Sequence, residues 1–100
     1  MEERPIAVSS LVIDGVNRSV VRPLEFAISF DSTEGIYAAT GDFHITVAAE
    51  TRDELKDTID AVLIALWREY VAADPRNFSA DALVLREKLN RTFLGAAHAA

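Results

Sequence analysis

The two histidines are the side chains best suited to catalysis or metal binding in this chain of 100 residues. His44 follows Asp42 by two positions, a spacing that places both side chains on one face of an extended strand. A histidine and a carboxylate on one face make half of a metal site. His98 lies near the end of the chain, where nothing fixes the geometry that a catalytic base needs. Because no cysteine or second histidine is at hand to complete a ligand set, we interpret His44 as a surface strand residue and expect no metal site.

Carboxylates gather at the start of the segment Thr51–Val71. On a helix, Asp53, Asp57 and Asp60 share one face, opposite the apolar face of the same segment. Catalytic carboxylates need burial or a cleft to shift their pKa values, so this cluster is typical of a solvated surface. The chain has no glycine-rich phosphate-binding motif either. We therefore predict a protein that is not an enzyme and that holds no cofactor.

Composition favours a globular, cytoplasmic protein. Half of the residues are hydrophobic, and neither a signal peptide nor an apolar run long enough to span a membrane is evident. The net charge of −6 disfavours direct nucleic-acid binding, which needs clustered basic side chains. Arg86, Lys88 and Arg91 are the one local basic concentration, and 86 and 88 do not share a helical face. The acidic balance suits a basic partner, or serves solubility alone.

The segment Thr51–Val71 is the element that must organise the fold. Thr51 and Glu54 have the spacing of a capping box, in which each side chain accepts from the other residue's backbone N–H. Apolar residues then recur at spacings of three and four, which predicts an amphipathic helix wide enough to cover a sheet. The predicted buried stripe consists of Leu55, Ile59, Val62, Leu63, Leu66, Trp67 and Tyr70.

Short strands are predicted before this helix. After a charged lead-in at residues 1–5, a strand at residues 6–14 ends at an Asp14-Gly15 turn signal, and residues 16–19 are expected to connect it to the next strand. Pro23 marks an edge or an interruption in that next strand. Alternation predicts further strands at 24–31, 36–40 and 43–49. We expect an antiparallel meander of three or four strands, with the helix across the face that carries Phe26, Ile28, Phe30, Ile45 and Val47. Whether residues 6–14 join the main sheet is left open.

A second helix is predicted from Ser79 as N-cap to residue 94, with Gly95 as the residue after its end. Ala82, Leu85, Leu89 and Phe93 form its apolar stripe. The predicted fold class is thus α+β, with the order β-β-β-β-α-α. We expect one domain at residues 1–95 and a flexible tail at 96–100.

Aromatic side chains near the junction of the two helices are candidates for an interface, because such residues are enriched in binding hot spots. Trp67 is better explained as core, whereas Tyr70 and Phe78 fit either role. An apolar second helix and an open meander favour a homodimer or larger oligomer. We predict a partner or oligomer interface that includes Tyr37, Tyr70, Phe78, Leu89 and Phe93.

The order of these motifs resembles the HicB-like antitoxin family over residues 24–73. The matching pieces are residues 26–31, Gly35-Ile36-Tyr37-Ala38-Ala39, residues 43–47 and Glu50-Thr51-Arg52-Asp53-Glu54-Leu55. The chain departs from the family in having Thr40-Gly41-Asp42-Phe43-His44 in place of a Pro-Asp-Leu-Pro-Gly-type segment. It also has a single helix at 79–94 where many members carry a DNA-binding domain.

The resemblance implies a partial RNase H-like sheet without nuclease chemistry, in a short form that lacks the DNA-binding domain. It implies a non-catalytic interaction module that binds and neutralises a small basic RNA-cleaving toxin. The alternative is a stand-alone homo-oligomeric domain of the same fold, with a scaffold or regulatory role and no toxin partner.

Overall fold

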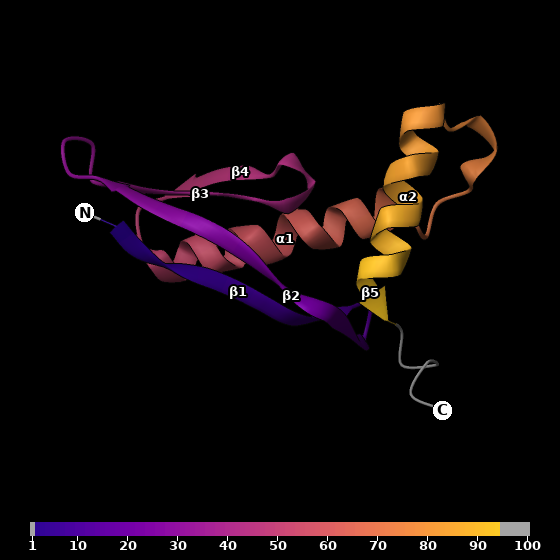
Figure 1. Ribbon diagram of the computed structural model, residues 1–100, viewed down its shortest axis with the longest axis horizontal. Coiled ribbons are helices and arrows are strands. Elements are labelled where there is room, and N and C mark those ends of the chain that lie inside the picture. Colours follow the sequence, from indigo (N-terminus) through magenta and orange to yellow (C-terminus); the bar gives the residue numbers. More distant parts are fainter. Residues whose placement is uncertain (1, 95–100) are drawn as a thin grey trace. The chain divides into compact units, whose positions relative to one another are not determined.

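The computed structural model describes residues 2–94 and has an α+β fold (Figure 1). Four strands form an antiparallel sheet in sequence order: β1 (Glu2–Ile13), β2 (Val16–Asp31), β3 (Ile36–Gly41) and β4 (Thr46–Ala49). Two helices follow, α1 (Arg52–Tyr70) and α2 (Ala80–Thr92). The predicted order of four strands and two helices is confirmed, and the first strand does join the sheet. The two-residue strand β5 (Phe93–Leu94), which pairs with β2, was not predicted.

The chain forms two compact units. Unit 1 comprises residues 1–8 and 24–62, and unit 2 comprises residues 9–23 and 63–100. Strands β1 and β2 and helix α1 each contribute to both units. In β2 the division falls after Pro23, which cannot donate to a ladder, and the pairing changes there as well: Val20 pairs with β5, whereas Phe26 pairs with β3. Pro23 thus marks a change of strand partner inside a continuous strand.

The division in β1 falls where the buried positions change parity. Ile6 and Val8 are buried in unit 1, and Leu11 and Ile13 are buried in unit 2. Side chains alternate between faces along a regular strand, so these even and odd buried positions do not belong to one uninterrupted alternation.

The core of unit 1 lies between the sheet and the first half of α1. The side chains buried there are Ile6, Val8, Leu24, Phe26, Ile28, Ala39, Ile45, Leu55 and Ile59. Apart from Ile45, which directly precedes β4, they come from one face of the strands and one stripe of the helix, as the alternation and the helical spacing predicted. Phe30 differs from the prediction, because its side chain at the end of the same face is 40% exposed.

Helix α1 begins and ends close to its predicted limits. The Thr51 hydroxyl accepts a hydrogen bond from the backbone N–H of Glu54 at 3.1 Å, which confirms the cap. The buried positions are spaced by four, at Leu55, Ile59, Leu63 and Trp67. Leu66, which we expected on the buried stripe, is half-buried at its margin. The buried stripe is therefore narrower than the run of apolar residues.

In unit 2 the two-residue turn Asp14-Gly15 connects β1 to β2, and the predicted connection over residues 16–19 is wrong, because these residues already belong to β2. Asp14 and Gly15 have φ angles of 51° and 82°, the left-handed conformations that a tight hairpin requires and that an Asp-Gly pair adopts readily. The buried side chains of this unit are Leu11, Ile13, Leu63, Trp67, Leu89 and Phe93. The Trp67 and Phe93 rings meet edge to face, with centroids 5.9 Å apart.

Helix α2 starts as predicted and ends earlier. The Ser79 hydroxyl accepts from the N–H of Ala82 at 3.2 Å, a regular N-cap. The helix stops at Thr92, and Phe93 is extended, at φ −106° and ψ 115°, where it pairs with Val20. The prediction of a helix to residue 94 is therefore wrong, because strand pairing replaces its last turn. Gly95 as a C-terminal cap and the tail at 96–100 lie outside the described residues.

Two predicted strand limits are also wrong. Strand β1 begins at Glu2, so residues 2–5 are part of the sheet and not a lead-in. The predicted strand 43–49 begins only at Thr46, because Phe43 and His44 have φ angles of 59° and 57° and belong to a tight turn, η1 (Asp42–His44). A second such turn, η2 (Pro75–Asn77), connects the helices.

Candidate interaction surface

His44 does not form the half-site that its spacing suggested. Its φ of 57° places it in the η1 turn, and its side chain is exposed. The alternation that would align His44 with Asp42 exists only in a strand, so the shared face is absent. Within residues 2–94, no group of three or more His, Asp or Glu side chains is arranged to hold a metal ion. His98 lies outside the described residues.

The carboxylates of α1 lie on its solvated side. Asp53 and Asp57 are exposed, and Asp53 stands in the first turn, where the helix dipole favours negative charge. Asp60 accepts from the Lys56 ammonium at 2.7 Å, one helical turn away. This arrangement is that of a charged helix surface, as the sequence indicated.

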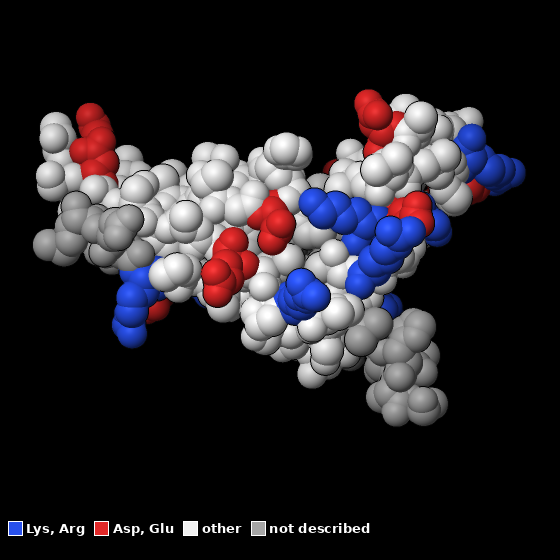
Figure 2. Space-filling model, viewed as in Figure 1, with Lys and Arg blue, Asp and Glu red and all other residues white. Residues whose placement is uncertain are grey.

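Charge is divided unevenly between the two units. Unit 1 carries eleven acidic and three basic residues, a net charge of −8, whereas unit 2 carries five acidic and seven basic residues, a net charge of +2. Figure 2 shows acidic and basic side chains interspersed on the face drawn, with several basic ones close together over the region of α2. The acidic character of the whole chain thus belongs to unit 1, which presents a field attractive to basic groups.

Ion pairs and a cation–π contact order the surface of unit 2. The Arg68 guanidinium donates to the Asp14 carboxylate at 2.6 Å, and this hydrogen bond lowers the pKa of Asp14 below its usual 3.8. The Arg18 guanidinium lies over the Trp67 ring, 4.4 Å from its centroid. Planar guanidinium groups stack readily on aromatic faces, so Arg18 covers the outer side of a core residue.

The five predicted interface residues fall into two groups. Leu89 and Phe93 are 0% and 2% exposed and belong to the core of unit 2. Tyr37, Tyr70 and Phe78 are half-buried. Tyr70 and Phe78 contact each other edge to face at 5.8 Å in unit 2. In unit 1, Tyr37 contacts Phe30 with ring centroids 4.7 Å apart. Their part in an interface stays a prediction.

The structure exposes apolar residues that the sequence analysis did not single out. Leu83 and Val84 on α2 are 46% and 66% exposed, and Val12 and Val21 on the β1–β2 hairpin are 63% and 57% exposed. The sequence could have indicated the exposure of Val84, because this residue lies off the apolar stripe that contains Leu85 and Leu89. All four of these exposed apolar side chains belong to unit 2.

In comparisons with known proteins, the chain matches no family model, no curated protein and no solved structure. The resemblance to HicB-like antitoxins therefore rests on the sequence motifs alone. No helix among residues 2–94 has the length and apolar character needed to cross a membrane.

Proposed function

We propose that the protein is a non-catalytic interaction module that binds a small basic protein, in the manner of a HicB-like antitoxin that neutralises an RNA-cleaving toxin. The segregation of charge carries the proposal. A net charge of −8 on unit 1 accelerates encounter with a basic partner and disfavours acidic ones. The resemblance of the motif order to HicB-like antitoxins suggests the class of partner, a small basic RNA-cleaving toxin.

The first experiment is co-expression with a small, strongly basic protein encoded by a neighbouring reading frame. The two proteins should co-purify at low ionic strength and separate at high salt, because exposed charges are screened within a Debye length. The complex should cleave RNA more slowly than the basic protein alone. Failure to co-purify at low salt contradicts the proposal.

Charge variants then locate the partner on unit 1. Neutralising Asp53 and Asp57 together, as D53N/D57N, should weaken binding about fivefold, because exposed ion pairs contribute about 0.2–1 kcal/mol each. The control E69Q/D81N removes the same charge from exposed positions of unit 2 and should bind as the wild type does. Equal losses in both variants would mean that net charge alone governs binding.

The second candidate is a homo-oligomer, favoured by the exposed apolar residues of α2. Leu83 and Val84 are adjacent on the helix, and an exposed pair of large apolar side chains suits burial against a second copy. Light scattering at micromolar concentration should then give at least a dimeric mass, which V84K should reduce to that of the monomer. A monomeric wild type excludes this candidate.

A further inference from the structure

Strand β4 is one edge of the sheet of unit 1. The sheet order is β1-β2-β3-β4, and among the described residues β4 pairs with β3 alone. Where this ladder begins, the N–H of Gly41 donates to the carbonyl oxygen of Ile45 at 3.2 Å. Bonded and non-bonded pairs alternate along an antiparallel ladder, so the backbone N–H and C=O groups of Thr46 and Ala48 point away from β3. These groups are the free edge of β4, and both residues are exposed.

The opposite edge of this sheet, in β1, is protected against a further strand. Pro5 has no N–H to donate. The Arg52 guanidinium donates to the carbonyl oxygens of Arg4 at 2.6 Å and Pro5 at 3.4 Å, which engages acceptors of the same stretch of backbone. Proline and charged side chains are common means of keeping a sheet edge unpaired. Strand β4, with the sequence TVAA, contains neither, so its edge is open to pairing.

The face of the sheet that turns away from the core is acidic. Glu25, Ser29 and Asp31 alternate with the buried side chains of β2, so they lie on this outer face. Ala38 is directly opposite both Ser29 and Ala48, which places the side chain of Ala48 on the outer face as well. The outward positions of β4 thus share a face with two carboxylates.

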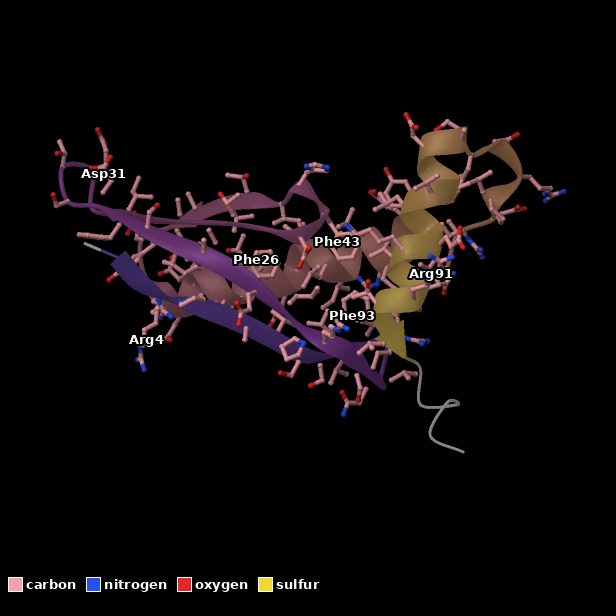
Figure 3. The ribbon with its side chains drawn as sticks, in the orientation of Figure 1. Arg4, Phe26, Asp31, Phe43, Arg91 and Phe93 are labelled. Atoms are coloured by element: carbon pink, nitrogen blue, oxygen red, sulfur yellow. The ribbon has the colours of Figure 1, made fainter. Side chains whose placement is uncertain are left out.

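The basic side chains of unit 1 lie elsewhere. Arg4 has the same parity as the buried side chains in its half of β1, so it lies on the core face. On α1, Arg52 bonds to β1 and Lys56 pairs with Asp60. Figure 3 shows Arg4 on the β1 side of unit 1, and Phe43, in the turn before β4, on the other side. Among the described residues of unit 1, the outer face therefore carries carboxylates without a Lys or Arg.

We propose that the free edge of β4 is the docking site for an extended basic segment of the partner, which pairs antiparallel with β4 and adds a strand to the sheet. The inference rests on the proposed function and adds the place and the mode of contact. Residues directly opposite each other share a face, so the partner residues that bond to Thr46 and Ala48 carry their side chains on the outer face. Lysine or arginine at these alternate positions lies on the face of Glu25 and Asp31. Apolar residues between them lie on the core face, beside the half-buried Val47.

Charge decides between this occupant and a second copy of the chain. Pairing of two β4 strands would join two outer faces that both carry Glu25 and Asp31, in two units that each have a net charge of −8. Like charges oppose such pairing, whereas a basic strand neutralises the same carboxylates. The free edge of β4 therefore suits a basic segment.

The test uses peptides of alternating valine and lysine from which backbone N–H groups are removed by N-methylation. Methyl groups on two lysine nitrogens remove donors that face β4, whereas methyl groups on two valine nitrogens remove donors that face away, at equal charge and composition. In isothermal titration at low ionic strength, the lysine-methylated peptide should bind about 25-fold more weakly than the unmethylated one, about fivefold for each hydrogen bond. The valine-methylated peptide should bind like the unmethylated one. Amide hydrogen exchange at Thr46 and Ala48 should slow when the unmethylated peptide binds.

The variant Ala48→Pro removes a donor of the same edge from the protein. The N–H of Ala48 takes no part in the ladder with β3, so proline leaves that pairing intact. The variant should bind the unmethylated peptide at least about fivefold more weakly. Ala48→Ser keeps the N–H and a small side chain, and this control should bind like the wild type. If proline unfolds the chain, the methylated peptides test the same bonds on the wild-type protein.

Each other outcome has one meaning. Equal binding of the two methylated peptides overturns strand addition, and weakening by valine methylation alone overturns the antiparallel orientation. A basic protein that co-purifies equally with folded Ala48→Pro and Ala48→Ser shows that the docking site is wrong, while the proposed function stands. If no basic peptide or protein binds the wild type, the proposed function itself fails. A wild-type dimer that Ala48→Pro dissociates shows that a second copy occupies the edge and overturns the choice of partner.

Discussion

Position 41 requires glycine because there is no space for a Cβ atom, and not because of its backbone conformation. Its φ of −165° is extended backbone that any residue adopts. A Cβ at this position, however, would lie 2.5 Å from Cδ1 and 2.9 Å from Cε1 of Phe26, the residue directly opposite on β2. It would also lie 2.8 Å from the carbonyl oxygen of Glu25. Contacts below 3.0 Å cannot be tolerated, so Gly41→Ala must displace a fully buried ring or the backbone of β2.

The expected cost follows from these contacts. Overpacking a well-packed core costs about 1–3 kcal/mol. Replacing glycine by alanine lowers the entropy of the unfolded chain, which offsets about 0.4–1 kcal/mol of that. Because the Phe26 ring is fully buried and one of the three clashes is with backbone, we expect a net loss of about 1–2 kcal/mol from the free energy of unfolding. A loss of that size is a substantial part of the ~5–15 kcal/mol that stabilises a typical domain.

The assay is urea denaturation followed by circular dichroism, with the midpoint and slope fitted for each variant. A double-mutant cycle with Phe26→Val isolates the steric cause, because valine lacks the δ and ε ring atoms that the new methyl would meet. The Gly41→Ala cost should fall by at least about 0.5 kcal/mol in that background. Gly35→Ala is the control. No atom lies within 4 Å of its Cβ position and its φ is +67°, so its cost is conformational and should not depend on residue 26. A Gly41→Ala cost that is equal in both backgrounds refutes the reasoning.

Three further predictions concern the helix, the η1 turn and the hairpin. Leu63→Ala should cost about 2–5 kcal/mol and Leu66→Ala clearly less in chemical denaturation, because Leu63 is 0% exposed and Leu66 is half-buried; equal costs would contradict the burial pattern. His44→Gly should raise the free energy of unfolding by up to about 1 kcal/mol, and with it the urea midpoint, because glycine adopts a φ of 57° without the strain that histidine bears there. A lower midpoint would show that the histidine side chain stabilises the turn. Asp14→Asn keeps a residue suited to the left-handed turn and removes the ion pair with Arg68. Because Arg68 lowers the pKa of Asp14, the pair stabilises the fold above pH 3.8 and its contribution is lost as pH falls through the lowered pKa. Thermal melts should therefore show a wild-type advantage at neutral pH that disappears in strong acid, and an advantage independent of pH would exclude the ion pair as its source.

Local signals in the sequence were sufficient for most elements of this fold. Thr51 and Ser79 cap their helices because a hydroxyl accepts from an N–H three residues on, and that interaction depends on adjacent sequence alone. The Asp14-Gly15 turn is equally local. The strand order followed from short turns between consecutive strands.

The errors arose where distant residues, or a backbone conformation unusual for the residue type, decide the structure. Val20 pairs with Phe93 across most of the chain, and no local pattern indicates that pairing. At residues 43–47 the alternation of side chains continued through Phe43 and His44, although both have positive φ. Neither phenylalanine nor histidine indicates a left-handed backbone conformation in the sequence, whereas glycine does.

The same distinction explains what was missed in the candidate surface. Alternation assigned Phe30 to the core face correctly, but how far the core extends over that face depends on tertiary packing, which alternation does not report. Leu89 and Phe93 illustrate the converse, because an apolar stripe predicts burial without saying whether the chain itself or a partner provides it. The side chains left for a partner are those that the core fails to reach.

Charge and packing act on unit 1 in opposite directions. Eleven carboxylates on so small a unit repel one another, and a net charge far from zero weakens the compact state. The core side chains and the capped α1 helix hold the unit together against this repulsion. A basic partner that binds only the folded form would relieve the repulsion and, by mass action, stabilise the fold as it binds. For an interaction module, the acidic surface that weakens the free protein is then also the source of the affinity.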